Sequence, residues 1–470
     1  MVEHSRQGTM IEFFGGLGVI GGSKIMISTP NARVLLDIGL DIPSGTDLFR
    51  APVRPRPGHE LADYLSTGQA PAMPGVYDPA MLPSRGSRAT DLAVLGEPDP
   101  RPSAIFLSHP HIDHDGMLGF VRPGLTCYAH PDAVGLHRAL ALSGLGPAGH
   151  PVDLTPAEPG AAIEIGDLLI EPIRVDHDVP GACGYLVTAP DGRIAYTGDI
   201  NTHRDEGIHS QDFADRVRGV DVLITETTML SFDPLPDEPK GEQHVLQTIT
   251  EQLGGDALQL ISAYERDVER MQSIISAAGS QGRTMVWPGQ QAAFLALMGV
   301  RNVVSWDDSR PQRKPHQIAM ANALADGHPV PTVSLDEVWD HPGDYLVELD
   351  ADDDPAMLDL PITAETRWIH SQGEPLGPYM PQWQPFVDWL DHLGVQTVRA
   401  GSSGHAGPQS LVDLVTAINP RVVYPIHGFR PEALAEALLA TGSGPTAVVP
   451  EAGQRYPLPV AVPAAGSRSS

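Results

Sequence analysis

Cysteine is scarce in this sequence, and long apolar runs are missing. Only Cys127 and Cys183 are present among 470 residues, which excludes a disulfide scaffold and a metal site built from thiolates. No apolar run reaches the roughly 20 residues of a membrane-spanning helix, and residues 1–6 lack the apolar stretch of a signal peptide. We therefore expect no membrane association and a cytoplasmic location. Apolar residues make up 41% of the chain, enough for the cores of two or three globular domains.

Basic residues are also few. Lys and Arg number 30 against 59 Asp and Glu, which gives a formal net charge of −29. This charge is unfavourable for nonspecific binding of a polyanion through phosphate contacts. Bound divalent cations would supply positive charge locally, so a nucleic-acid substrate is still compatible with the composition. The acidic run at residues 348–354 is more typical of a solvated face or loop than of a metal site.

Histidine and aspartate, in contrast, are concentrated in one segment, Ser-His-Pro-His-Ile-Asp-His-Asp-Gly at residues 108–116. The preceding Ala-Ile-Phe-Leu is typical of a buried strand, so the segment begins where a strand ends, a common place for functional groups. His109 and His111 are spaced to close on one ion, while Asp113 and His114 face a second. A polar turn with surface histidines is disfavoured, because scattered histidines seldom fall into this register. The segment therefore predicts a site for two divalent metal ions.

This segment resembles the His-x-His-x-Asp-His signature of the metallo-β-lactamase superfamily, and later parts of the chain match the rest of that pattern. Residues 33–39 resemble its early strand ending in Asp, so Asp37 is expected to support the ligands by hydrogen bonding. Taken alone, Asp199 could cap a turn, and His177 or His427 could be a buried core histidine. The order of all three along the chain favours their interpretation as metal ligands. The resemblance implies a first site of His109, His111 and His177, a second site of Asp113, His114 and His427, and Asp199 shared by both.

The chain between Asp199 and His427 contains a long insertion. Within it, helical spacing over residues 265–278 is followed by a strand pattern at 283–287, which predicts a separate α/β domain. Glu226, Ser403-Gly404-His405-Ala406 and Pro425-Ile426-His427-Gly428 resemble three motifs of the β-CASP nucleases. We therefore expect an α/β fold: a metallo-β-lactamase αββα sandwich over residues 1–228 and 395–455, an inserted β-CASP domain over 229–394, and a flexible tail over 456–470.

Within the β-CASP group, the sequence resembles ribonuclease J. Residues 371–375, Ser-Gln-Gly-Glu-Pro, resemble a run of that family, residues 15–18 resemble its glycine-rich start, and residues 268–272 resemble its β-CASP helix. Gly289-Gln290-Gln291 replaces the family's Gly-Arg-Ser loop, which removes a cation near the expected RNA path. No counterpart of the family's separate C-terminal domain is found, so we expect a short form.

The resemblance implies a ribonuclease that uses two divalent ions, Zn²⁺ or alternatively Mn²⁺, to hydrolyse single-stranded RNA from the 5′ end, internally, or both. A hydroxide held by the ions would attack the phosphodiester, with Asp113 and Asp199 as metal-holding catalytic residues. His405 would donate a hydrogen bond to the scissile phosphate or the leaving oxygen. The residues implied to bind substrate are Ser371, Ser403, Gly404 and His405, with Asp37 and Glu226 behind the ligands.

Two other functions are open from the sequence. A dimetal hydrolase of a small phosphodiester or another metabolite is favoured by the acidic composition and the missing arginine. A binding or regulatory protein without catalysis is disfavoured, because all seven ligand positions are filled. Whether the chain forms a homodimer, and whether RNA or DNA is preferred, is left open as well.

Overall fold

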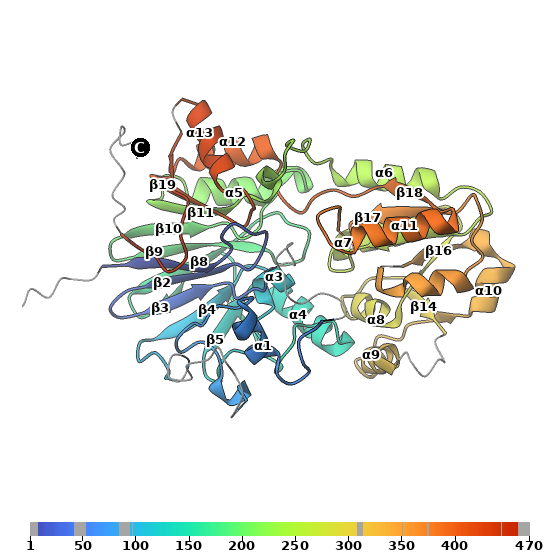
Figure 1. The fold of residues 1–470 in the computed structure, drawn as a ribbon, viewed down its shortest axis with the longest axis horizontal. Helices are drawn as coiled ribbons and strands as arrows, with labels where there is room; N and C mark the ends of the chain where they lie inside the picture. Colours follow the sequence, from blue (N-terminus) through green and yellow to red (C-terminus); the bar gives the residue numbers. More distant parts are fainter. Residues whose placement is uncertain are drawn as a thin grey trace, which may run out of the picture.

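The computed structural model describes residues 8–41, 53–83, 95, 97–307, 314–349, 351–373, 376–442 and 444–458. Within these residues the chain forms three sheets of seven strands each. Two of the sheets stack at one end of the molecule, and the third lies at the other end (Figure 1).

The first sheet combines antiparallel and parallel pairing. Its order is β21 (Arg455–Pro457), β1 (Met10–Gly15), β2 (Lys24–Ser28), β3 (Arg33–Leu36), β4 (Ser103–Leu107), β5 (Thr126–Ala129) and β6 (Thr155–Pro156). Strands β21 to β3 pair antiparallel and β3 to β6 pair parallel. The prediction of a flexible tail over residues 456–470 is wrong at its start, because residues 456 and 457 belong to β21, which pairs with β1. Residues 459–470 lie outside the described part of the chain.

The second sheet has the same mixed character. Its order is β20 (Thr446–Ala447), β19 (Val422–Ile426), β11 (Val222–Glu226), β10 (Gly192–Tyr196), β9 (Cys183–Ala189), β8 (Leu168–Arg174) and β7 (Ile163–Ile165). Strands β10, β11, β19 and β20 are parallel, so β10, β11 and β19 end at the same edge. This edge is where the later motifs begin.

The space between these two sheets holds an apolar core. Ile25 and Ile27 of β2 face this core, whereas Met26 packs in a different cluster on the other face of the sheet. This alternation follows from the period of two in a β-strand. The outer face of the first sheet is covered by α1 (Glu60–Thr67), α3 (Ile112–Asp115) and α4 (Pro131–Ser143), and that of the second by α5 (Ile208–Arg216), α12 (Pro408–Ile418) and α13 (Glu432–Ala440) (Figure 1).

The ends of the covering helices are set by local sequence. Helices α4 and α12 both carry Pro at their first position, where the missing N–H costs no hydrogen bond. They end before Gly144 and Asn419, both in the left-handed region that closes a helix.

The third sheet is entirely parallel and belongs to the insertion. Its order is β15 (Thr332–Val333), β14 (Val304–Trp306), β13 (Thr284–Trp287), β16 (Tyr345–Glu348), β12 (Gln259–Ala263), β17 (Arg367–Ser371) and β18 (Gln396–Arg399). Its helices are α6 (Glu242–Gln252), α7 (Val268–Ser280), α8 (Gly289–Leu297), α9 (Lys314–Ala325), α10 (Leu335–Asp340) and α11 (Trp383–Leu393). The αββα sandwich with an inserted α/β domain is thereby confirmed.

Two details of the insertion differ from the sequence-based expectation. Strand β18 pairs with β17, which moves the junction expected at 394/395 to a point after Arg399; the other domain boundaries stay predictions. Glu348, expected in a solvated acidic run, is buried at the end of β16 with 2% of its surface exposed, while Asp350 lies outside the described residues. None of the described helices is long and apolar enough to cross a bilayer.

Phe106 tests the core between the two stacked sheets. It is fully buried, stacks on Tyr128 at 5.0 Å between ring centroids, and meets the edge of Tyr185 at 5.5 Å. We predict that Phe106→Ala lowers the free energy of unfolding by about 3–5 kcal/mol, measured by urea denaturation. Leu439→Ala, at a side chain that is 81% exposed, is the control and should change it by less than about 0.5 kcal/mol. Equal effects of the two substitutions would contradict this packing.

Candidate metal centre

The site lies where strands of both stacked sheets end. Asp37 follows β3, and residues 108–111 follow β4, its parallel neighbour. From the second sheet, Asp199, Glu226 and His427 lie at the ends of β10, β11 and β19, and His177 lies in the β8–β9 connection. Loops at aligned strand ends can bring residues distant in sequence together on a rigid frame.

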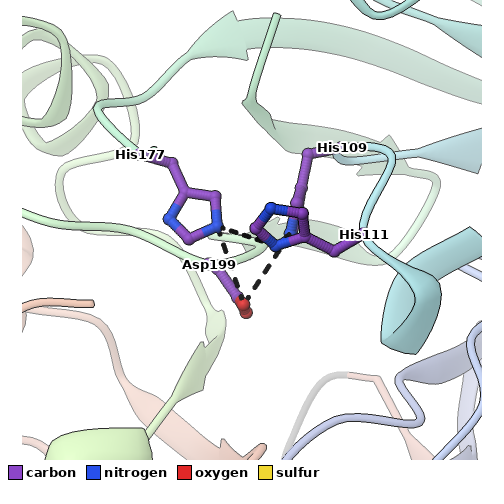
Figure 2. A group of neighbouring side chains, drawn as sticks. All are labelled: His109, His111, His177 and Asp199. Atoms are coloured by element: carbon purple, nitrogen blue, oxygen red, sulfur yellow. Dashed lines mark hydrogen bonds and ion pairs between the residues drawn. The ribbon is translucent and has the colours of Figure 1, made fainter. Parts of the chain in front are cut away.

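The first cluster consists of three histidines and one aspartate, drawn in Figure 2: His109, His111, His177 and Asp199. Nδ1 of His111 lies 3.1 Å from Nε2 of His109 and 3.4 Å from Nε2 of His177. Burial lowers the pKa of His111 to about 3 and that of His109 well below its usual range. Unprotonated imidazoles converging at these distances are the form in which histidine binds a cation.

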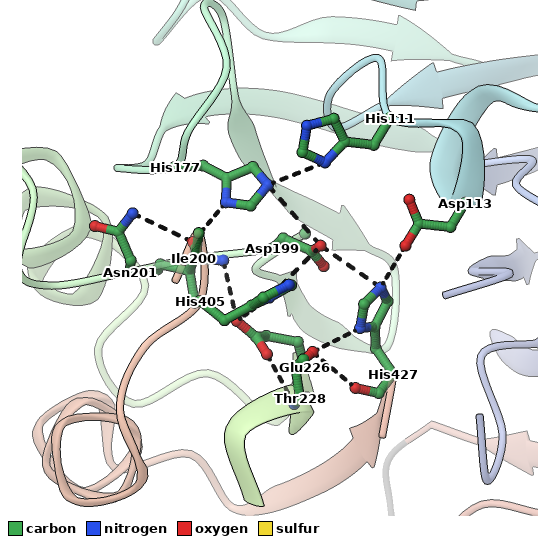
Figure 3. A network of polar contacts seen from close by, with 12 residues as sticks. His111, Asp113, His177, Asp199, Ile200, Asn201, Glu226, Thr228, His405 and His427 are labelled. Atoms are coloured by element: carbon green, nitrogen blue, oxygen red, sulfur yellow. Dashed lines mark hydrogen bonds and ion pairs between the residues drawn. The ribbon is translucent and has the colours of Figure 1, made fainter. Parts of the chain in front are cut away.

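The second cluster is buried more completely and contains Asp113, His114, Asp199 and His427. Nε2 of His427 lies 3.0 Å from Asp113 Oδ2 and 3.2 Å from Nε2 of His114 (Figure 3 shows His427, Asp113 and Asp199). The Asp199 carboxylate is shared: its Oδ1 lies 3.3 Å from His114 Nε2, and its Oδ2 lies 3.8 Å from His109 Nε2. The structure thus brings together all seven residues that the sequence predicts as ligands.

The residues present fit divalent cations. Oδ1 of Asp199 and Nε2 of His111 are buried without a hydrogen-bond partner. Burial alone would raise the pKa of Asp199, but His114, His427 and His405 outweigh it, so the pKa is held well below its usual range. An ionised carboxylate among imidazole nitrogens is a donor set that suits Zn²⁺ or Mn²⁺.

Asp37 supports the ligands from behind. Its Oδ2 accepts a hydrogen bond from His114 Nδ1 at 2.7 Å, which leaves Nε2 of that ring directed at the second cluster. It also accepts from the backbone and hydroxyl of Ser108 at 2.6 and 2.7 Å and from Tyr196 at 2.6 Å. Asp37 adopts a left-handed backbone conformation, φ 58°, and is fully buried. This strained residue is therefore tied down by four hydrogen bonds.

The other ligand histidines are oriented in a similar way. Nδ1 of His177 donates to the Gly404 carbonyl at 2.6 Å, and Nδ1 of His427 lies 2.8 Å from the Thr228 hydroxyl, which donates to the His427 carbonyl at 3.1 Å. Both contacts leave Nε2 facing the cluster. The role of Thr228 was not predicted from the sequence, although it closes the Thr-Glu-Thr-Thr run that carries Glu226.

His405 and Glu226 form a pair beside the shared aspartate (Figure 3). Nδ1 of His405 lies 3.0 Å from Glu226 Oε1 and 3.7 Å from Asp199 Oδ2. Burial alone would lower the pKa of His405, but Glu226 and Asp199 outweigh it and raise the pKa to about 10. Bound cations would offset part of that negative charge. His405 is thus held by Glu226 beside the aspartate that the two clusters share.

A cavity of about 700 Å³ opens onto the clusters. Ser403, Gly404 and His405 line it, and their contacts with a substrate stay predictions. Ser371 does not fit the prediction, because it is fully buried at the end of β17; its neighbours Gln372 and Gly373 line the cavity instead, and Glu374 and Pro375 lie outside the described residues. The side of the cavity formed by the insertion includes Tyr264, Glu265, Arg266, Gln290, Gln291, His316 and Glu348.

Two parts of the chain match known domain families. Residues 81–268 match the beta-lactamase superfamily domain, and residues 395–450 match the Zn-dependent metallo-hydrolase RNA specificity domain. Together they cover the sandwich from residue 81 onward, the start of the insertion, and the return of the chain after it. The ligand positions fall in these two segments.

Whole-chain comparisons agree with these matches. Ribonuclease J of Sinorhizobium meliloti is 26% identical over 245 residues, which cover 50% of this chain and 41% of that protein. Ribonuclease J of Pyrococcus abyssi is 24% identical over 358 residues, which cover 72% of this chain and 78% of that protein. Ribonuclease J of Mycobacterium tuberculosis is 25% identical over 368 residues, which cover 73% of this chain and 61% of that protein. The match therefore spans less than two thirds of the length of two of these three relatives. A crystal structure of a protein of unknown function from Enterococcus faecalis V583 superimposes with a TM-score of 0.75 at 24% identity, over 96% of this chain and 100% of that one, and shows the same fold. In its matched domains, its inserted sheet and its relatives, this chain is similar to ribonuclease J and to the β-CASP branch of the metallo-β-lactamase superfamily.

Proposed function

We propose that the protein is a metal-dependent ribonuclease that hydrolyses phosphodiester bonds of single-stranded RNA with two divalent ions, Zn²⁺ or alternatively Mn²⁺. The observation that carries this proposal is the pair of buried ligand clusters that share Asp199 at the floor of one cavity. The ribonuclease J relatives and the RNA specificity domain match support RNA as the substrate. Cleavage from the 5′ end, internally or both, the cytoplasmic location and a homodimer stay predictions.

The protein side of the chemistry is divided between the clusters. His109, His111 and His177 would hold one ion, Asp113, His114 and His427 the other, and Asp199 both. Bound divalent ions supply Lewis acidity and activate a water for attack on phosphorus. Asp199 Oδ1, which has no hydrogen-bond partner, can accept the proton that this water loses.

His405 is placed to act on the departing oxygen. Its Nδ1 is engaged by Glu226, so the donor available to the substrate is Nε2–H. The carboxylates of Glu226 and Asp199 raise the pKa of the ring, which favours its protonated form. Proton donation from Nε2 would neutralise the alkoxide that leaves as the phosphodiester breaks. Ser403 and Gly404, adjacent in the same loop, would contact a phosphate of the substrate.

A small-molecule phosphodiester is the second candidate, and the charge of the cavity favours it. Among the described residues that line the cavity, Arg266 is the only Lys or Arg, whereas five are acidic: Asp113, Asp178, Asp199, Glu265 and Glu348. A volume of about 700 Å³ also falls within the range of small-molecule sites.

The two candidates are separated by substrate choice. Metal-loaded protein is incubated with 5′-monophosphorylated, 3′-labelled single-stranded RNA, a matched 5′-hydroxyl RNA and bis(p-nitrophenyl) phosphate. The ribonuclease proposal predicts metal-dependent RNA cleavage, faster on the 5′-phosphate RNA if the Ser403 loop binds that group. Cleavage of the small diester alone, by protein shown to contain two ions, would favour the second candidate.

Asp199 tests the shared site. We predict that Asp199→Ala lowers the metal content below two ions per chain and reduces kcat by at least about 100-fold, because losing a shared ligand should exceed the 10–100-fold effect of outer partners. Elemental analysis and steady-state kinetics measure the two effects. Asp413→Ala, at an exposed position on α12, is the matched control and should change neither. Full metal content and activity in Asp199→Ala would rule out the bridging role.

His405 tests proton donation separately from metal binding. His405→Ala should retain both ions but lower kcat by roughly 100-fold or more, as for the loss of an oriented donor. Elemental analysis and kcat are measured together on the same preparation. If kcat stays at the wild-type value, His405 is not the donor; if metal is lost, its role is in holding the ions.

A further inference from the structure

The inserted domain contacts the loops of the first metal cluster through the start of α7. Arg266, two residues before α7, donates from Nη1 to the Pro110 carbonyl at 2.7 Å and from Nη2 to the Leu145 carbonyl at 3.3 Å. Pro110 lies between the ligands His109 and His111. One guanidinium of the insertion therefore holds the main chain that joins two ligands of the same cluster.

A buried ion pair reaches the third ligand of that cluster. Arg204 donates from Nη2 to Asp267 Oδ1 at 2.7 Å and from Nη1 to the carbonyl of His177 at 3.3 Å. Asp267 caps α7 and is 1% exposed, and Arg204 is 6% exposed. Breaking a buried pair leaves an uncompensated charge, so this contact has a strongly preferred geometry.

Arg270, in the first turn of α7, reaches the loop behind His177. Its guanidinium binds both carboxylate oxygens of Glu242 at 2.6 and 2.8 Å and lies 3.4 Å from the Ser402 carbonyl. Ser402 precedes the loop in which the Gly404 carbonyl accepts from His177 Nδ1. The orientation of His177 thus depends on a loop that α7 also contacts.

The second cluster is held differently. Asp37 and Thr228, both from the stacked sheets, orient His114 and His427. Three ligands belong to the second cluster alone: Asp113, His114 and His427. In the described part of the chain, none of the three arginines named above donates a hydrogen bond to the main chain of these ligands. The two clusters therefore differ in which domain supports them.

We propose that Arg204, Arg266, Asp267 and Arg270 form a positioning cluster through which the inserted domain fixes the first metal site, so that affinity for that ion depends on contacts between the domains. This proposal rests on the dimetal function proposed above. It assigns these residues no contact with the reacting atoms. Outer partners of metal ligands typically change affinity by 10–100-fold when they are removed.

The test measures Zn²⁺ affinity of the full chain by competition with a chromophoric chelator. We expect Arg266→Met and Asp267→Asn each to lower the affinity for one of the two ions by about 10–100-fold and to leave the affinity for the other unchanged. The control is Asp326→Asn, which breaks another ion pair between the domains, Arg138–Asp326 at 2.6 Å, away from the ligand loops, and should weaken neither ion. In a His427→Ala background, which keeps the first site, Arg266→Met should lower the affinity for the remaining ion. In a His111→Ala background, which keeps the second site, Arg266→Met should leave the affinity for the remaining ion unchanged.

Each outcome decides between the proposals. Wild-type affinity for both ions in Arg266→Met, or equal weakening of both, overturns the positioning role while the dimetal function stands. If Asp267→Asn does not fold, Arg266→Met decides alone, because Arg266 is less buried than Asp267 and belongs to no buried ion pair described above. A wild-type protein that binds fewer than two ions would overturn the dimetal function, and the positioning proposal with it.

Discussion

The buried carboxylate of Asp199 is the constraint on which the rest of the site depends. With 2% of its surface exposed and its pKa held well below the usual range, it is an ionised group with little contact to solvent, and that state is costly unless positive charge or donors surround it. Imidazole rings from both stacked sheets do so, at 3.3 Å for His114 and 3.5 Å for His427. The two sheets must therefore meet in one register for the carboxylate to be tolerated. This requirement couples the packing of the sandwich to the chemistry at its edge.

The support behind the ligands follows from the same geometry. A histidine directs Nε2 at the centre only if Nδ1 has a fixed partner, and each partner found here comes from a different kind of group: the Asp37 carboxylate, the Gly404 carbonyl and the Thr228 hydroxyl. Asp37 and Thr228 belong to the stacked sheets, whereas Gly404 lies in the chain returning from the insertion. The insertion itself reaches the ligand loops through Arg266, which donates to the Pro110 carbonyl, and it forms one side of the cavity.

Sequence reasoning succeeded where the relevant residues are close together or follow a periodic pattern. The ligand run at residues 108–116, the α7 helix and the β13 strand needed only local order. It failed where the end of a strand decides: Ser371 is the buried last residue of β17, whereas Gln372, with a left-handed backbone at φ 64°, leaves the strand and lines the cavity. The bond from Arg266 to Pro110 joins positions 156 residues apart, and no local pattern marks such a pair.

The same arginine bears on how an acidic protein could bind a polyanion. Arg266 is the single Lys or Arg among the described cavity residues, and two backbone carbonyls already engage its guanidinium. Protein cations therefore contribute little to phosphate attraction inside the cavity. The positive charge that a phosphate would meet there must therefore come largely from bound divalent ions. In such a site, binding of a phosphate substrate depends on prior binding of the metal ions. Without the ions, the carboxylates of Asp113 and Asp199 at the floor of the cavity would repel a negatively charged ligand.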